Sequence, residues 1–261
     1  MKADYKNWVP KGMIWGFGAG CLAAAVMFAV CKVIMAESIL RTILLIISAA
    51  AAVILLAATV WLAYMHCMFS YDGKRQLSRQ IVEGTADYVS IPDGGIGLDV
   101  GCGSGALTIA CAKRNPKARM IGIDRWGKEY ASFNKPLCES NAQAEGVSNV
   151  QFQKGDALKL DFPDETFDAV TSNYVYHNIV GANKQDCLRE TLRVLKKGGF
   201  FALHDIMSKS RYGDMEAFAQ QLRDEGYAHV ELIDTTDGMF MSREEALLME
   251  LSGSTLLVGR K

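Results

Sequence analysis

The hydrophobic pattern of the chain changes near residue 71, where two long apolar segments give way to short apolar runs and amphipathic stretches. The long segments cover residues 12–35 and 42–69, and a helix that crosses a bilayer needs about 20 apolar residues. The pattern therefore predicts a membrane hairpin within residues 1–70. A cleaved signal peptide and a pair of buried core helices are the alternatives, but a signal h-region has only about 7–15 apolar residues.

From residue 71 onward, short apolar runs alternate with amphipathic stretches, which is typical of a parallel sheet with crossover helices. Strands are expected at residues 96–100, 119–123, 150–154, 167–172, 199–206, 229–235 and 255–259. Helices are expected at residues 75–89, 105–114, 128–145, 182–196, 213–226 and 243–251. Residues 71–261 are thus predicted to form an α/β domain with a doubly wound, mostly parallel, Rossmann-like sheet of seven strands.

Two local signals refine the end of this domain. Ser242 and Glu245 have the spacing of a capping box, which fixes the start of the last helix. Only that short helix and turns separate the last two strands, so the final strand is expected to run antiparallel to its neighbours.

Composition and charge narrow the class of protein. The seven cysteines form no C-x-x-C pair and no Cys/His ligand spacing, so they are interpreted as reduced thiols without a metal site. The net charge of the whole chain is −1, and residues 1–71 carry five basic and two acidic side chains, or +3. The remainder therefore carries −1 minus 3, or −4, and an acidic domain is a poor partner for nucleic acid.

The charges that flank the hairpin favour a topology with both termini in the cytoplasm. Three lysines precede the first span, two basic residues lie at the turn, and three follow the second span, which is a weak positive-inside bias. Within the first span, Gly12, Gly16, Gly20 and Ala24 recur at every fourth position. Such a strip allows close helix packing, either within the hairpin or in a homodimer.

A glycine turn follows the first predicted strand, in "LDVGCGSGA" at residues 98–106. Gly101 and Gly103 leave room for the backbone to approach a ligand, and Asp124 after the next strand can accept hydrogen bonds from two ribose hydroxyls. A dinucleotide and a sulfonium nucleoside both fit this pair of features.

Five motifs in order distinguish these two ligands: "LDVGCGSG", "GIDR", "GDA", "FDAVTSN" and "LRVLKKGGFFALHD". With them, residues 75–260 resemble the class I S-adenosylmethionine-dependent methyltransferases. The resemblance implies a methyltransferase fold, S-adenosylmethionine as cofactor and S-adenosylhomocysteine as product. No second domain remains of the kind that a nicotinamide dehydrogenase uses for its substrate.

The resemblance also implies roles for residues of the first two loops. Gly101 and Gly103 would lie under the methionine and ribose, and Asp99 would brace this loop. Asp124 would bind the ribose hydroxyls, and Trp126 would cover one face of the adenine. For Asp99, a purely structural carboxylate is an equally good interpretation.

In the later loops the resemblance places Asp156 on the adenine amino group and the N–H of Ala157 on the adenine ring. Asn173 would stand beside the sulfonium. Tyr174 and His177 are the candidate catalytic residues, because they follow Asn173 on the acceptor side and one of them can remove a proton. A structural histidine is the alternative for His177.

The loop "SNYVYHN" lacks the two prolines of enzymes that methylate nucleobase amines and resembles the loop of small-molecule and lipid methyltransferases. We therefore expect a membrane-anchored enzyme that methylates a lipid, quinone or other hydrophobic small molecule at the cytoplasmic leaflet of the inner membrane. The alternatives are a tethered methyltransferase of a soluble small molecule or protein, and a donor-binding membrane sensor without turnover.

Overall fold

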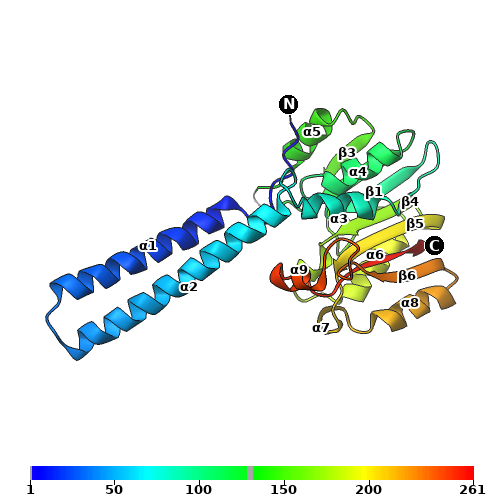
Figure 1. Ribbon diagram of the computed structural model, residues 1–261. Coiled ribbons are helices and arrows are strands. Elements are labelled where there is room, and N and C mark those ends of the chain that lie inside the picture. The colour runs from blue at the N-terminus through cyan, green and yellow to red at the C-terminus, as the bar shows by residue number, and fades with distance from the viewer. Residues whose placement is uncertain (1, 128–131) are drawn as a thin grey trace. The chain divides into compact units, whose positions relative to one another are not determined.

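The computed structural model describes residues 2–127 and 132–261 (Figure 1). The described chain forms two compact units: Asn7–Ser78 is one, and the chain before Asn7 together with Arg79–Lys261 is the other. The boundary expected at residue 71 thus falls inside the first unit. The few residues before Asn7 join the second unit because the backbone N–H of Asp4 donates to Oδ1 of Asn141 at 2.7 Å.

The unit Asn7–Ser78 is built on two long helices, α1 (Lys11–Ile34) and α2 (Ile39–Phe69). Their mean hydropathies are 2.1 and 2.8, and only 11% and 6% of their most apolar windows are buried. Both helices therefore have the length and composition of membrane spans. The second begins earlier than expected because Ser38 caps it, its hydroxyl accepting from the N–H of Arg41 at 3.2 Å.

The strip of small residues in α1 divides into two parts. A Cβ built at Gly20 would lie 3.4 Å from Cδ1 of Leu55 in α2, and Ala24 is buried. At Gly12 and Gly16, no described atom lies within 4 Å of such a Cβ. The half of the strip formed by Gly20 and Ala24 thus packs within the hairpin.

In the second unit, a single sheet of seven strands carries the architecture (Figure 1). Its order is β3-β2-β1-β4-β5-β7-β6. The strands are β1 (Ile96–Val100), β2 (Arg119–Asp124), β3 (Val150–Lys154), β4 (Phe167–Asn173), β5 (Leu195–Ile206), β6 (Ala228–Asp234) and β7 (Ser254–Arg260). The helices are α3 (Leu77–Ala86), α4 (Ala106–Arg114), α5 (Lys135–Ala144), α6 (Lys184–Arg193), α7 (Lys209–Tyr212), α8 (Met215–Asp224) and α9 (Arg243–Leu248), with the 3₁₀ turn η2 (Tyr176–Asn178).

The sheet confirms the expected strand pattern. β1 to β5 pair in parallel, and β7 runs antiparallel to both β5 and β6. The capping box is also present, with the hydroxyl of Ser242 accepting from the N–H of Glu245. Central strands are buried on both faces, as parallel strands covered by helices must be, and Leu98, Val170 and Leu203 are fully buried.

Several helix boundaries differ from the expectation by one to three residues, and one differs by more. The helix expected at 128–145 begins at Lys135, where Asn134 caps it and Pro136 occupies the first turn. Residues 128–131 of that prediction lie outside the described residues. The short elements η2 and α7 were not expected, because three or four residues carry too little periodicity to predict a helix.

Candidate active site

The candidate residues gather at the carboxyl edge of the sheet, around β1. The chain passes from β1 to β2 and β3 on one side and then returns to β4 on the other side. Such a change of direction opens a crevice at the carboxyl ends of the strands, where ligands bind in open α/β sheets. The loops after β1, β2 and β4 meet there.

The glycine turn after β1 has the backbone conformation that its sequence requires. Gly101 and Gly103 have φ values of 75° and 54°, a region that side chains with a Cβ rarely adopt. A Cβ at Gly101 would lie 2.3 Å from Cγ2 of Val175, so this position is closed by protein. At Gly103, the one described atom near a Cβ is Cδ2 of Phe133, at 4.0 Å. Among the described residues, no atom therefore lies closer than 4.0 Å to the place where a side chain of residue 103 would begin.

Asp124, at the end of β2, is joined to this turn. Its Oδ2 accepts from the N–H of Gly103 at 2.9 Å, and its Oδ1 accepts from the N–H of Trp126 at 2.7 Å. The indole N–H of Trp126 donates to the carbonyl of Gly103 at 3.0 Å. Because each carboxylate oxygen has a second lone pair, Asp124 retains acceptors for ligand hydroxyls.

Helix α5 holds the same turn from another direction. The thiol of Cys138 donates to the carbonyl of Gly103 at 3.2 Å, and Nδ2 of Asn141 donates to the carbonyl of Ser104 at 3.0 Å. Neither residue was predicted from the sequence to lie at this site. Their spacing of three places them on one face of a helix, but no motif marks that face as the one toward the turn.

Asp99 lies beneath the turn and is 1% exposed. It accepts hydrogen bonds from the hydroxyls of Thr108 at 2.6 Å and Thr171 at 3.0 Å, so it joins β1 to α4 and β4. Burial raises the pKa of Asp99 to about 7, against the hydrogen bonds of the two threonines. Its position is that of a brace for the loop.

The loop after β3 contributes Asp156 and Ala157. Oδ1 of Asp156 accepts from the N–H of Leu158 at 3.0 Å, and the carboxylate is half-buried. Ala157 is buried, 9% exposed.

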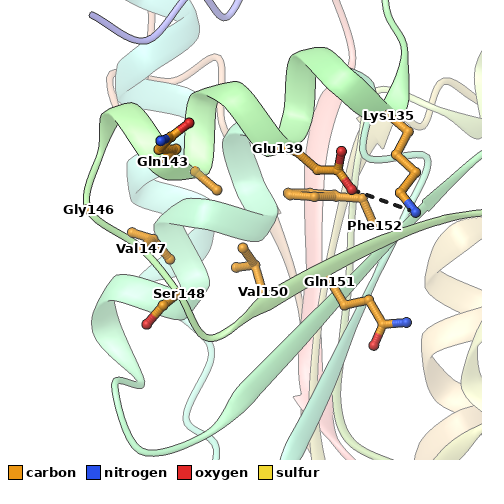
Figure 2. A pocket seen from close by; sticks show the side chains of 10 residues that line it. Lys135, Glu139, Gln143, Gly146, Val147, Ser148, Val150, Gln151 and Phe152 are labelled. Atoms are coloured by element: carbon orange, nitrogen blue, oxygen red, sulfur yellow. Dashed lines mark ion pairs between the residues drawn. The ribbon is translucent and has the colours of Figure 1, made fainter. Parts of the chain in front are cut away.

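A surface groove of about 490 Å³ lies between α5 and the edge strand β3 (Figure 2). An ion pair between Lys135 and Glu139, at 3.6 Å, lies along it. Gln143 and Gln151 also line it. Lys135, Glu139 and Gln143 come from the face of α5 that does not carry Cys138 and Asn141, and Gln151 comes from the edge strand.

On the acceptor side, His204 is buried, and both of its ring nitrogens are hydrogen bonded. Its Nδ1 lies 2.8 Å from Oδ1 of Asn173, and its Nε2 lies 2.9 Å from Oγ1 of Thr235. Burial lowers the pKa of His204 to about 3. With both ring nitrogens engaged, His204 stays neutral and holds Asn173 at the end of β4.

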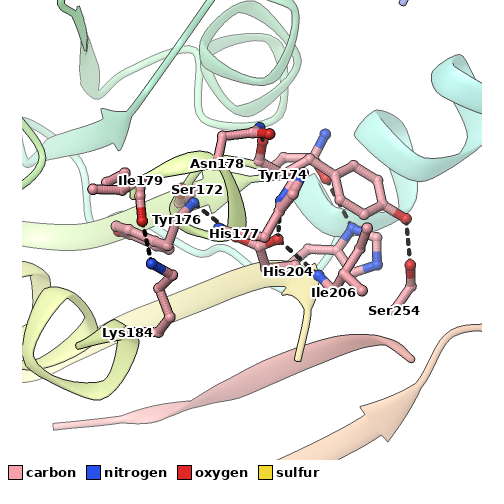
Figure 3. Close-up of polar contacts among 12 residues, drawn as sticks. Ser172, Tyr174, Tyr176, His177, Asn178, Ile179, Lys184, His204, Ile206 and Ser254 are labelled. Atoms are coloured by element: carbon pink, nitrogen blue, oxygen red, sulfur yellow. Dashed lines mark hydrogen bonds and ion pairs between the residues drawn. The ribbon is translucent and has the colours of Figure 1, made fainter. Parts of the chain in front are cut away.

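His177, in η2, forms a pair with Asp205 at the end of β5 (Figure 3). Nδ1 of His177 lies 2.5 Å from Oδ1 of Asp205, and the His177 side chain is 15% exposed. Asp205 also accepts from the N–H groups of Tyr176, His177 and Ile206. Burial would raise the pKa of Asp205, but the hydrogen bonds from His177 and the backbone hold this pKa below its ordinary value. The ionised Asp205 thus orients the imidazole and leaves Nε2 for another partner.

Tyr174 packs between the two histidines (Figure 3). Its ring centroid lies 4.7 Å from that of His204 and 6.0 Å from that of His177, and its hydroxyl lies 2.7 Å from Oγ of Ser254. Burial raises the pKa of Tyr174 well above its ordinary value, so the phenol keeps its proton. Its φ of 54° is unusual for a residue with a side chain, and strained positions of this kind cluster at functional sites.

Comparison with known families gives the class of the protein. A family model described as a methyltransferase domain matches residues 92–245, more than half of the chain. The chain therefore belongs to this family of methyltransferase domains.

Curated relatives extend this comparison. An uncharacterized methyltransferase of Bacillus subtilis is 39% identical over 108 residues, covering 41% of this chain and 39% of its own length. A 2-phytyl-1,4-naphtoquinone methyltransferase of Thermosynechococcus vestitus is 31% identical over 135 residues, covering 51% of this chain and 56% of its own. The chain spans about two fifths to three fifths of the length of such relatives.

Solved structures share the fold at low sequence identity. The [4+2]-cyclase SpnF has a TM-score of 0.55 and 20% identity, covering 72% of this chain and 82% of its own. Geranyl diphosphate C-methyltransferase from Streptomyces coelicolor has a TM-score of 0.52 and 16% identity, covering 71% of this chain and 79% of its own. Since one of these proteins is a cyclase, the fold alone does not define the reaction.

Proposed function

We propose that this protein is a membrane-anchored methyltransferase that uses S-adenosylmethionine to methylate a lipid, a quinone or another hydrophobic small molecule. The donor site fits that cofactor: no described atom lies closer than 4.0 Å to a Cβ built at Gly103, and Asp124 stands beside this position with acceptors for the ribose hydroxyls. Asp156 and Ala157 after β3 are available for the adenine, and Asn173 for the reacting centre. When bound, this cofactor supplies an electrophilic methyl group with a neutral leaving group.

The pair formed by His177 and Asp205 carries the proposal. Nδ1–H of His177 donates to Asp205, so Nε2 accepts the proton of an acceptor hydroxyl as its oxygen bonds to the methyl carbon. The bound donor would give up its methyl group to that oxygen and would keep the electron pair of the carbon–sulfur bond on its sulfur. Asp205 stabilises the imidazolium that results. The ring of Tyr174 packs against His177, and His204 packs against Tyr174. These two residues position the pair and do not transfer a proton themselves.

Relatives with hydrophobic acceptors support this substrate class. Besides the naphtoquinone methyltransferase, a protein named demethylmenaquinone methyltransferase from Lactobacillus johnsonii is 36% identical over 112 residues. A protein named erythromycin 3''-O-methyltransferase, from Saccharopolyspora erythraea, is 26% identical over 195 residues. A hydroxyl acceptor carries a proton that must leave, so its methylation makes use of a general base.

The topology of the chain supports the membrane anchor. Residues before α1 hydrogen bond with α5, so the two chain segments that flank the hairpin must share one side of any membrane. Two spans satisfy this requirement, whereas one span would not. Since S-adenosylmethionine is made in the cytoplasm, we propose that both termini and the catalytic unit lie there, in agreement with the positive-inside bias.

The proposed reaction is tested by incubating the full chain with radiolabelled S-adenosylmethionine and fractionated membrane extract. We expect label in the lipid fraction. Label only in soluble products would favour the tethered enzyme of a soluble acceptor, and donor binding without any labelled product would favour a sensor.

Replacing Asp124 by alanine is expected to weaken donor binding by about 1.5–3 kcal/mol, because charge-assisted hydrogen bonds to the ribose are lost. Asp234 at the end of β6 is the matched control, since its carboxylate also accepts from the N–H two residues later, that of Thr236 at 2.8 Å. Asp234→Ala should leave donor affinity unchanged in calorimetric titration. If Asp124→Ala bound the donor as tightly as the wild-type protein, the assignment of the donor site would be contradicted.

Exposed leucines on α9 give a test of membrane contact. Because β7 is antiparallel to both β5 and β6, the connection that carries α9 lies at the carboxyl edge of the sheet. Leu247 and Leu248 are 72% and 49% exposed there. Glutamate at both positions is expected to lower methylation of vesicle-borne acceptor about 10-fold and to leave donor affinity unchanged, since burying charge in the interface is unfavourable.

Tyr88, which precedes β1 at the opposite edge of the sheet, provides the control for this pair. It is 36% exposed. Tyr88→Glu should retain the wild-type rate in the same vesicles. Equal rates for the leucine variant and wild type would argue that the catalytic unit does not touch the lipid surface.

A further inference from the structure

The short segment before α1 contacts the helix that holds the glycine turn. The N-terminal trace lies along α5 in Figure 1, within the catalytic unit. Its attachment is a pair of hydrogen bonds between the backbone of Asp4 and the side-chain amide of Asn141. The N–H of Asp4 donates to Oδ1 at 2.7 Å, and its carbonyl accepts from Nδ2 at 3.1 Å.

Asn141 connects this segment to the glycine turn. Its Nδ2 also donates to the carbonyl of Ser104 at 3.0 Å, and Asn141 is 1% exposed. One buried amide therefore bonds two backbone segments that are a hundred residues apart in the chain. Tyr5, next to Asp4, is buried at 7% exposure, so the segment is packed as well as hydrogen bonded.

We propose that docking of the backbone at residue 4 supports the donor site, and that Asn141 is a positioning residue that transmits this docking to the glycine turn. This inference rests on the proposed use of S-adenosylmethionine. When Asp4 is bound, Nδ2 of Asn141 is fixed between two carbonyls, and the carbonyl of Ser104 is held in place. When Asp4 leaves, Oδ1 of Asn141 loses its donor and Nδ2 keeps only the carbonyl of Ser104, so the buried amide is no longer held in a single orientation.

Docking of the segment before α1 also links the donor site to the membrane anchor. The docked segment leads directly into α1, which begins at Lys11. The catalytic unit is therefore connected to the hairpin at both of its ends, and donor binding and docking of the segment are linked. By reciprocity, the donor must strengthen docking by the same factor by which docking strengthens donor binding.

A proline at position 4 tests the contact between the segment and Asn141, because it removes a single backbone N–H. Asp4→Pro removes the N–H that donates to Asn141, whereas Asp4→Ala keeps both backbone groups and removes only the carboxylate, which pairs with Lys6. The full-length variants are titrated with S-adenosylhomocysteine in nanodiscs of phosphatidylethanolamine and phosphatidylglycerol. We expect Asp4→Pro and Asn141→Ala each to weaken binding by about 5- to 30-fold, and Asp4→Ala to stay within about twofold.

The double variant separates positioning from general loss of stability. Asp4→Pro with Asn141→Ala should bind no more weakly than Asn141→Ala alone, because both changes break one connection. Asn149 is the matched control. Its half-buried side-chain amide also donates to backbone carbonyls, three of them at 2.8, 3.1 and 3.2 Å, but none of these belongs to the glycine turn. Asn149→Ala should lower the melting temperature and leave affinity for the probe unchanged.

Hydrogen exchange gives the reciprocal measurement on the wild-type chain. S-adenosylhomocysteine should slow exchange at the amides of Asp4 and Tyr5. Equal affinity of Asp4→Pro and Asp4→Ala, or multiplied effects in the double variant, would overturn the inference and leave the proposed function standing. Absence of probe binding by the wild-type chain would overturn the proposed function, and the inference with it.

Discussion

Replacing His177 by alanine is expected to lower the rate of methyl transfer to a hydroxyl acceptor by about 10²–10⁴-fold, the usual contribution of a positioned general base. Affinity for S-adenosylhomocysteine should stay within about twofold, because His177 follows β4 on the acceptor side. Single-turnover measurements with radiolabelled donor and the membrane fraction that accepts label give both quantities separately.

His229 is the matched control for this substitution, since it is an exposed histidine on β6. His229→Ala should keep the wild-type rate. Added imidazole should restore part of the activity of His177→Ala, which a purely structural histidine would not show. Unchanged turnover in His177→Ala would contradict its role as base, and loss of donor binding would place its loop on the wrong side of the methyl group.

The sheet was predictable from sequence because each strand of a doubly wound fold is a local apolar run bounded by turn residues. The ends of β1, β3 and β4 carry the motifs "LDVGCGSG", "GDA" and "FDAVTSN", so the strands and the donor loops were located together. The antiparallel final strand followed from the short connection before it. The membrane hairpin followed from length and apolarity alone, and its insertion remains part of the proposal.

The partners of the site residues were not predictable, because they come from distant parts of the chain. Asp205 lies at the end of an ordinary apolar strand in the sequence, and its contact with His177 depends on η2 turning back over the end of β5. Asn141 is an ordinary helix residue in the sequence. Its contact with Asp4 uses backbone atoms, which every residue has, so no side-chain pattern marks it.

Burial changes the interpretation of two further residues. Tyr174 and His204 are both titratable groups near the acceptor loop, and their residue types alone do not distinguish them from His177 as proton acceptors. In the fold, burial raises the pKa of Tyr174 and lowers that of His204, so both stay neutral at ordinary pH. The hydroxyl of Tyr174 hydrogen bonds with Ser254 at the start of β7, and Nε2 of His204 hydrogen bonds with Thr235, which directly follows β6. The candidate catalytic role of Tyr174 thus becomes a proposed positioning role.

Gly103→Val is the second substitution with a large expected effect. A valine Cβ at this position would enter open space beside the glycine turn, where Cδ2 of Phe133 at 4.0 Å is the one described atom nearby. The added methyl groups would fill the volume that we assign to the donor, so they should block it without striking the protein core. We expect donor affinity to fall by at least about 100-fold, which corresponds to about 2.7 kcal/mol.

Gly146, which follows α5, separates this effect from backbone strain. Its φ of 68° is close to the 54° of Gly103, and no described atom lies within 4 Å of a Cβ built there. Valine in the left-handed region costs about 1–3 kcal/mol of stability at either position, so both variants should melt at a lower temperature. Only Gly103→Val should lose binding of S-adenosylhomocysteine in calorimetric titration. If the two variants bound it equally well, the open space beside Gly103 would not be the donor site.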